Sequence, residues 1–406
     1  MTLRTVIIVS DSAQVDGGLG KVAVTSAIAL SEMGLRVIFF CPIAGIDPRL
    51  EAAGVTVHCL GQTAPSEDPS RWRGMMRGIW NRDAAGALRD LVLEHDPATT
   101  VLHCHGYSKA LSPAIGPILT GGPVRCLYTM HEFFLACPNG GFFDFPRAQI
   151  CSRKPLGLSC LTTQCDSRHA VHKVWRTARQ VALHGPGRMP RRLRDVAFIS
   201  DTQKQVMVPY LAAETRLHRV PNPVDLGKGP RVAAEDNDAF VFVGRLEPDK
   251  GALDFARAAK DAGVRAVFVG AGRQEAQIRA LLPDAQITGW VGPDAVASYL
   301  AQARALVFPS LWQETFGLVA YEALGRGVPV ITGAWNAAHE GIAQGETGLI
   351  YDMPDQLMAT LKAMDATTAG RMSQAAFARR DTYGLSPRAH ATRLVEVYQT
   401  LLQECT

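Results

Sequence analysis

Residues 309–331 read PSLWQETFGLVAYEALGRGVPVI, and this stretch decides the fold. It follows the apolar run Ala305–Phe308 and ends in a second apolar run, Val328–Ile331. The pattern predicts a strand, a loop, a helix and a further strand within a parallel α/β sheet. Such a sheet binds ligands at the carboxyl ends of its strands, where helices begin and their free N–H groups attract anions.

Two carboxylates flank the start of the predicted helix. Glu314 lies in the loop, and Glu322 lies eight residues further on, a little over two helical turns down the helix. Gly317, between them, allows close approach of the backbone. Carboxylates suit sugar hydroxyls and a helix N-terminus suits phosphate, so the pattern indicates a nucleotide-sugar pocket. The alternative is a solvent-facing loop glutamate and an unrelated helix glutamate.

Residues 309–323, followed by Gly327–Ile331, resemble the signature of the retaining family-four glycosyltransferases of GT-B type. The resemblance implies an α/β fold of two facing Rossmann-like, doubly wound domains with an interdomain cleft. It also implies transfer of a sugar from a nucleotide-diphosphate donor to a hydroxyl acceptor. The helix N-terminus at residues 316–318 would stabilise the diphosphate through Phe316, Gly317 and Leu318. Glu314 would hold the sugar, and Glu322 the ribose.

A second motif begins where the apolar strand 239–243 ends at Gly244. Arg245 and Lys250 flank the turn that follows, and a guanidinium with an ammonium suits a diphosphate. In the resembled family this pair holds the donor diphosphate, and the turn at Gly270 lines the nucleotide base. With both cations present, the resemblance implies that catalysis needs no metal cofactor.

The first half of the chain has weaker signals. Gly17 and Gly18 form a glycine-rich turn between a predicted strand and helix. His105 and His131 follow two further predicted strands, so both should face one crevice. The resemblance implies that the glycine pair borders the acceptor and the donor phosphates, and that His131 contacts the donor sugar.

The composition favours a globular protein of two domains. The chain has 406 residues, of which 47% are hydrophobic and 20% charged, with a net charge of +4. We expect an N-terminal acceptor-side domain over residues 1–220, completed by a C-terminal helix over 386–406, and a nucleotide-sugar-binding domain over 221–385. No apolar run is long enough to span a membrane, and no signal peptide is evident, so we expect a cytoplasmic protein that does not bind nucleic acid.

Four of the nine cysteines form a cluster in the sequence, within an insertion over residues 137–165. A loop rich in proline and glycine needs stabilisation, and thiolates around a structural zinc ion or an iron–sulfur cluster would provide it. The alternatives are reduced free thiols and disulfides. The predicted ligands are Cys137, Cys151, Cys160 and Cys165.

Residues 70–82 combine an apolar stripe with arginines. The stripe runs from Trp72 to Trp80 at helical spacing, and the arginines lie on the other face. One interpretation is an interfacial helix at the inner face of the cell membrane. The other is a helix that packs on its own domain.

Other functions on the same architecture stay open. A sugar-nucleotide 2-epimerase or a phosphorylase would use the same two domains. A nonenzymatic protein that binds nucleotide-sugars would keep the pocket without turnover.

Overall fold

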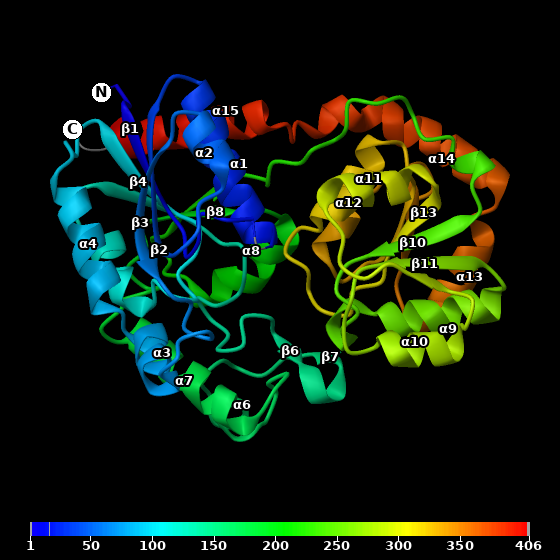
Figure 1. The fold of residues 1–406 in the computed structure, drawn as a ribbon, viewed down its shortest axis with the longest axis horizontal. Helices are drawn as coiled ribbons and strands as arrows, with labels where there is room; N and C mark the ends of the chain where they lie inside the picture. Colours follow the sequence, from blue (N-terminus) through cyan, green and yellow to red (C-terminus); the bar gives the residue numbers. More distant parts are fainter. Residues whose placement is uncertain (1, 16, 404–406) are drawn as a thin grey trace.

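The computed structural model describes residues 2–15 and 17–403 and contains two α/β units side by side (Figure 1). Met1 and residues 404–406, which the predicted domains include, lie outside the described residues. Residues 220–238 connect the two units, because β9 ends at Arg219 and β10 begins at Ala239.

The first unit is built on a seven-stranded parallel sheet with the order β3-β2-β1-β4-β5-β8-β9. Its strands are β1 (Thr5–Val9), β2 (Arg36–Ile43), β3 (Thr56–Gln62), β4 (Thr100–Cys104), β5 (Arg125–Thr129), β8 (Asp195–Phe198) and β9 (Arg216–Arg219). The central strands β1 and β4 are buried along their whole length. They read as continuous apolar runs because helices cover both faces of the sheet.

Helices of the first unit lie on both faces of this sheet (Figure 1). They are α1 (Gly18–Glu32), α2 (Pro48–Ala52), α3 (Arg71–Ile79), α4 (Arg82–Leu93), α5 (Gly116–Gly121), α7 (Ala170–His184), α8 (Asp201–Met207) and α15 (Pro387–Gln403). On one face, Leu30 of α1 packs in the same core as Leu394 and Tyr398 of α15. The last helix therefore returns from the second unit to the first.

The second unit has a six-stranded parallel sheet with the order β12-β11-β10-β13-β14-β15. Its strands are β10 (Ala239–Val243), β11 (Arg265–Val269), β12 (Gln286–Ile287), β13 (Ala303–Phe308), β14 (Val330–Gly333) and β15 (Gly348–Tyr351). Its helices are α9 (Ala252–Ala262), α10 (Glu275–Leu281), α11 (Pro293–Ala301), α12 (Leu318–Gly325), α13 (Leu357–Ala363) and α14 (Ala366–Arg379). The quoted stretch thus forms the loop after β13, helix α12 and the first half of β14, as predicted.

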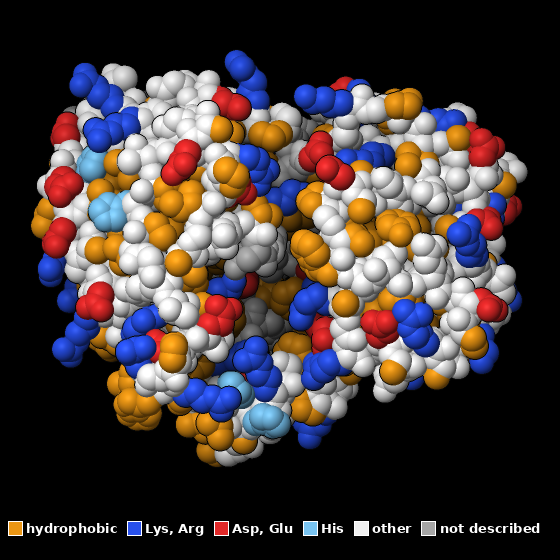
Figure 2. Space-filling model, viewed as in Figure 1, with side chains coloured by type: hydrophobic (Ala, Val, Ile, Leu, Met, Phe, Trp, Pro, Cys, Tyr) orange, Lys and Arg blue, Asp and Glu red, His pale blue; other side chains and the backbone are white. Residues whose placement is uncertain are grey.

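Both sheets follow the doubly wound strand order, in which the direction of winding reverses beside the first strand. The reversal leaves a crevice at the carboxyl ends of the strands, next to β1 and β4 in one sheet and β10 and β13 in the other. The molecular surface is hollowed between the two units (Figure 2). In the described part of the chain, no helix is both long and apolar enough to cross a bilayer.

A small excursion lies between β5 and α7. It contains the antiparallel pair β6 (Phe143–Asp144) and β7 (Gln149–Ile150) and the short helix α6 (Leu158–Thr162). The predicted cysteine ligands lie in and beside it.

Helix α3 packs through its glycines and not through its apolar stripe. A Cβ at Gly74 would lie 2.3 Å from the Pro65 carbonyl oxygen, and one at Gly78 would lie 2.6 Å from the Trp175 ring. Trp72 is 70% exposed, and Trp80 has left the helical conformation. Helix α3 thus packs on its own unit, as one of the two interpretations expected, but it does so through the small glycine face and leaves Trp72 exposed.

Candidate functional site

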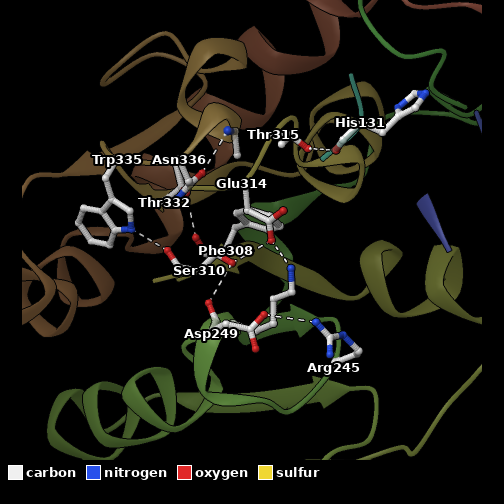
Figure 3. A network of polar contacts seen from close by, with 12 residues as sticks. His131, Arg245, Asp249, Phe308, Ser310, Glu314, Thr315, Thr332, Trp335 and Asn336 are labelled. Carbon is white, nitrogen blue, oxygen red and sulfur yellow. Dashed lines mark hydrogen bonds and ion pairs between the residues drawn. The ribbon is translucent and has the colours of Figure 1, made fainter. Parts of the chain in front are cut away.

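The loop between β13 and α12 is fixed by polar contacts of its own residues (Figure 3). The Ser310 hydroxyl donates to Glu314 Oε1 at 2.9 Å, and Trp335 Nε1 donates to the Ser310 carbonyl at 2.7 Å. Gly317 precedes α12 with a φ of 86°, and a Cβ there would lie 2.8 Å from Ala338 Cβ. Glycine is therefore required where the chain turns into α12. We call residues 309–317 the donor loop.

Lys250, on the turn before α9, forms an ion pair with Glu314 of the donor loop. The Lys250 ammonium also lies 4.7 Å from the centre of the Trp312 ring. Burial alone would raise the pKa of Glu314, but the Lys250 ammonium and the Ser310 hydroxyl together hold this pKa below its ordinary value. Glu314 is therefore ionised at neutral pH.

Arg245 and Lys250 lie on the turn between β10 and α9. Arg245 is exposed and its Nη2 lies 3.3 Å from Asp249 Oδ2, while the buried Asp249 Oδ1 has no hydrogen-bond partner. The turn is pressed against the donor loop, because the Leu311 N–H donates to the Asp249 carbonyl at 2.9 Å. A Cβ at Gly251 would lie 2.1 Å from the Pro309 carbonyl oxygen. Lys250 thus contacts the predicted sugar-binding carboxylate, and Arg245 lies on the same turn as Lys250.

Glu322 faces the first unit. Lys21 Nζ of α1 lies 2.6 Å from Glu322 Oε1 of α12, so an ion pair crosses between the two units. A Cβ at Gly18 would lie 3.5 Å from the Leu318 side chain. The start of α1 and the start of α12 therefore lie against each other, with Gly17 on the same turn.

The predicted histidines meet at the carboxyl ends of β4 and β5. His105 Nδ1 and His131 Nε2 are 2.9 Å apart, and the two rings stack with an angle of 13° between their planes. Burial lowers the pKa of His131 to about 3, so this ring is neutral at physiological pH. The Thr315 hydroxyl donates to the His131 carbonyl at 2.9 Å and ties the donor loop to this strand end (Figure 3).

Three other predicted site residues, Phe316, Gly244 and Gly270, pack against neighbouring parts of the second unit. Phe316 is buried and stacks on Tyr321, with 4.7 Å between ring centroids, so its side chain belongs to the core. Gly270 packs against Gly244, since a Cβ at Gly270 would lie 1.9 Å from the Gly244 carbonyl oxygen. These two turns sit side by side at the carboxyl end of the second sheet.

Residues 237–366 match the family described as glycosyl transferases group 1. The second unit is a group 1 glycosyltransferase domain. The predicted family is thereby confirmed.

Curated proteins that are similar in sequence to this chain are also glycosyltransferases. The chain is 30% identical over 161 residues to a GDP-mannose-dependent alpha-mannosyltransferase of Mycolicibacterium smegmatis, covering 40% of this chain and 43% of that protein. It is 32% identical over 241 residues to a D-inositol 3-phosphate glycosyltransferase of Mycobacterium avium, covering 52% and 56%. The chain thus spans about half the length of these curated relatives.

The fold of the whole chain is similar to that of a sucrose-phosphate synthase from Thermosynechococcus elongatus. The TM-score is 0.69 at 16% identity, over 99% of this chain and 100% of the other. The Anabaena protein HepE, solved with UDP and glucose, gives a TM-score of 0.69 at 15% identity, over 98% and 100%. These likenesses confirm the predicted GT-B fold.

The four cysteines predicted to hold a metal lie in and beside the excursion between β5 and α7. Among the described residues, no group of three or more His, Cys, Asp or Glu side chains could hold a metal ion. The Lys173 ammonium lies 3.2 Å from Cys165 Sγ and 3.6 Å from Cys160 Sγ, so a side-chain cation supplies the positive charge there. None of the described cysteines forms a disulfide.

Two contacts between the glycosyltransferase domain and the first unit were not predicted from the sequence. Glu340 accepts hydrogen bonds from the Asp201 and Thr202 N–H groups and from the Thr202 hydroxyl at 2.7 to 3.0 Å. A carboxylate of one unit thus caps helix α8 of the other. The ion pair of Lys21 with Glu322 is the second contact. The one sequence signal for it was the position of Lys21 directly after the glycine-rich turn.

Glu132 also had no predicted role. It lines a small pocket at the carboxyl ends of β4 and β5, next to His105, His131 and Ser108. Burial and, to a lesser degree, Asp11 raise the pKa of Glu132 to about 7. A carboxylate with such a pKa in a pocket is a common property of functional sites.

Proposed function

We propose that this protein is a retaining glycosyltransferase that moves a sugar from a nucleotide-diphosphate donor to a hydroxyl acceptor. The observation that carries the proposal is the ion pair of Lys250 with Glu314 beside the N-terminus of α12, at the edge of the cleft. A cation, a buried carboxylate and free helix N–H groups together match the phosphates and hydroxyls of a nucleotide-sugar. The names of the curated relatives and the UDP and glucose of the Anabaena structure support the same class of donor.

The donor would exchange one set of charged contacts for another. Its diphosphate oxygens would bind Lys250 and Arg245, and its sugar hydroxyls would donate to Glu314 in place of the Lys250 ammonium. Glu322 would accept the ribose hydroxyls in place of Lys21. Lys250, Glu314 and Glu322 therefore each keep a partner when the donor is bound, which limits the cost of desolvation.

In the transfer step, the bond between the anomeric carbon and the donor phosphate oxygen breaks, and the acceptor oxygen forms a bond on the same face of the sugar. The acceptor proton passes to a phosphate oxygen of the leaving diphosphate. Lys250, Arg245 and the start of α12 would stabilise the charge that develops on that diphosphate. His131, which is neutral, would contact the sugar without adding charge.

A panel of nucleotide-sugars tests the donor class. A ligand that binds only the folded protein raises its melting temperature. With the donor found, analysis of products distinguishes the functions: transfer to an added polyol supports our proposal. An epimerised nucleotide-sugar from donor alone, a sugar phosphate formed with inorganic phosphate, or binding without turnover would each favour an alternative and contradict it.

We propose further that α3, α6 and α7 form a surface for anionic lipid. Apolar side chains on these helices are exposed, and Leu158 is 80% exposed. We call them the apolar patch: Trp72, Met76, Leu158, Leu161, Val171 and Val174. Hydrophobic side chains gather over α3 and α6, with Lys and Arg between them (Figure 2). Aromatic and aliphatic side chains beside arginines match the interface of an anionic membrane.

Co-sedimentation with vesicles tests this surface. We expect binding to vesicles that contain phosphatidylserine, weaker binding to neutral vesicles, and loss of binding when Trp72→Ser and Leu158→Ser are combined. Leu93→Ser, at a side chain that is 63% exposed on α4, is the control. Equal sedimentation of the parent with and without vesicles would contradict the proposal. The cytoplasmic location stays a prediction.

A structural metal at the four cysteines also stays a prediction. Asn139 Nδ2 donates to Cys165 Sγ at 3.2 Å, and Arg153 Nη1 lies 3.4 Å from Cys151 Sγ, as donors do beside thiolates. Elemental analysis and a visible spectrum of the purified protein decide between zinc, an iron–sulfur cluster and free thiols.

A further inference from the structure

The pocket lined by Glu132 lies on the first-unit side of the cleft, beneath the turn that begins α1. Its lining includes Leu19, His105, Ser108, His131, Glu132 and Phe134. Leu19 belongs to the glycine-rich turn, and the others follow β4 and β5, so the pocket occupies the crevice of the first sheet. The residues proposed to hold the donor diphosphate lie on the opposite unit. His131, which also lines this pocket, is the residue proposed to contact the donor sugar from the first unit.

Glu132 is the one carboxylate in the lining of this pocket, and it is partly exposed there. Burial and Asp11 raise the pKa of Glu132, whereas the charges of Arg179 and Lys109 lower it. Its histidine neighbours are buried and neutral, because burial lowers the pKa of both His105 and His131. A carboxylate that is partly exposed in a pocket can accept hydrogen bonds from a hydroxyl group that enters it.

The position of Glu132 is coupled to the donor loop. The preceding residue, His131, accepts the hydrogen bond of Thr315, which itself follows Glu314. The next residue, Phe133, packs edge-on against Trp312, with 6.4 Å between ring centroids. Contacts on both sides therefore fix Glu132 relative to the loop that would hold the donor sugar.

We propose that Glu132 binds the acceptor: its carboxylate accepts a hydrogen bond from a hydroxyl group of a polyhydroxylated acceptor and orients that molecule toward the donor sugar. This inference rests on the proposed glycosyltransferase activity. The acceptor hydroxyl that reacts still gives its proton to the donor phosphate, so Glu132 acts in binding and no proton balance changes. Ser108 lines the same pocket.

The test compares transfer with donor hydrolysis in the full chain. The donor is the nucleotide-sugar that gives the largest thermal shift, and the acceptor probes are glycerol, glucose, mannose and myo-inositol. We expect Glu132→Gln to keep the thermal shift by donor and to hydrolyse donor in water within about three-fold of the parent. The KM for the acceptor should rise at least about ten-fold, as for loss of one charged hydrogen bond.

Two further variants separate binding from folding. Glu132→Asp keeps the charge and should give an acceptor KM between those of the parent and Glu132→Gln, which a purely structural role would not produce. Glu94→Gln, at an exposed residue on the end of α4, is the matched control. An acceptor KM within two-fold of the parent in Glu132→Gln would overturn the assignment. A parent that turns over no nucleotide-sugar would instead overturn the proposed function, and this assignment with it.

Discussion

Replacing Glu132 by glutamine should stabilise the protein above neutral pH, and this gain follows from its surroundings. The folded pKa of Glu132 is about 7 against 4.5 for an unperturbed glutamate, because burial disfavours the charged form. The folded protein therefore binds more protons at this site than the unfolded chain between these two pH values. Its stability falls as pH rises through this window, and the loss is complete above about pH 7.

The magnitude follows from the pKa difference. A shift from 4.5 to about 7 corresponds to about 3 kcal/mol at high pH. Because the carboxylate is partly exposed to the pocket, we expect a gain of about 1 to 2 kcal/mol for Glu132→Gln at pH 8. The groups that also act on it are Asp11, Arg179, Lys109 and Ser108, and the variant leaves them unchanged.

Denaturant unfolding at pH 4.5 and at pH 8 measures this effect. The difference in unfolding free energy between Glu132→Gln and the parent should be near zero at pH 4.5 and favour the variant at pH 8. Glu94→Gln should show no such dependence. A variant that is less stable than the parent at pH 8 would refute the reasoning, because Glu132 would then have a stabilising partner in the folded state.

Three further predictions concern the donor loop and the cleft. Gly251→Ala should destabilise the protein by at least about 2 kcal/mol and abolish the donor thermal shift, because its Cβ would lie 2.1 Å from a donor-loop carbonyl. Gly263→Ala has a similar φ of 68° with open space around it, and should cost only about 1 kcal/mol in a melting experiment. Glu322→Gln should weaken nucleoside diphosphate binding at least about ten-fold by calorimetry, whereas Lys21→Met should change it by less than about five-fold. Thr315→Val should cost about 1 to 2 kcal/mol of unfolding free energy and reduce transfer more than donor hydrolysis in the product assay.

The fold could be predicted because its signals are local. Apolar runs followed by glycine turns mark parallel strands that are buried on both faces, and the stretch 309–331 contains a strand end, a helix start and the next strand. Lys250 and Glu314 were assigned to one ligand from separate motifs, and the structure places them in direct contact.

Contacts between distant parts of the chain could not be predicted from residue types. The pair Lys21 with Glu322 and the capping of α8 by Glu340 join the two units across many residues of sequence. Glu132 carried no signal, since its raised pKa arises from burial that only the folded chain creates. The close packing of α3 against Trp175 depends on Gly78, and no signal in the sequence indicated that contact.

Calorimetric titration of a nucleoside diphosphate into the parent and into Lys250→Ala tests the central claim most directly. That claim is that the cations beside the donor loop hold the diphosphate of an activated sugar. We predict saturable binding to the parent and binding at least about ten-fold weaker in the variant, with both proteins folded by circular dichroism. Equal affinity in the two proteins, or no binding of any nucleoside diphosphate to the parent, would contradict the account.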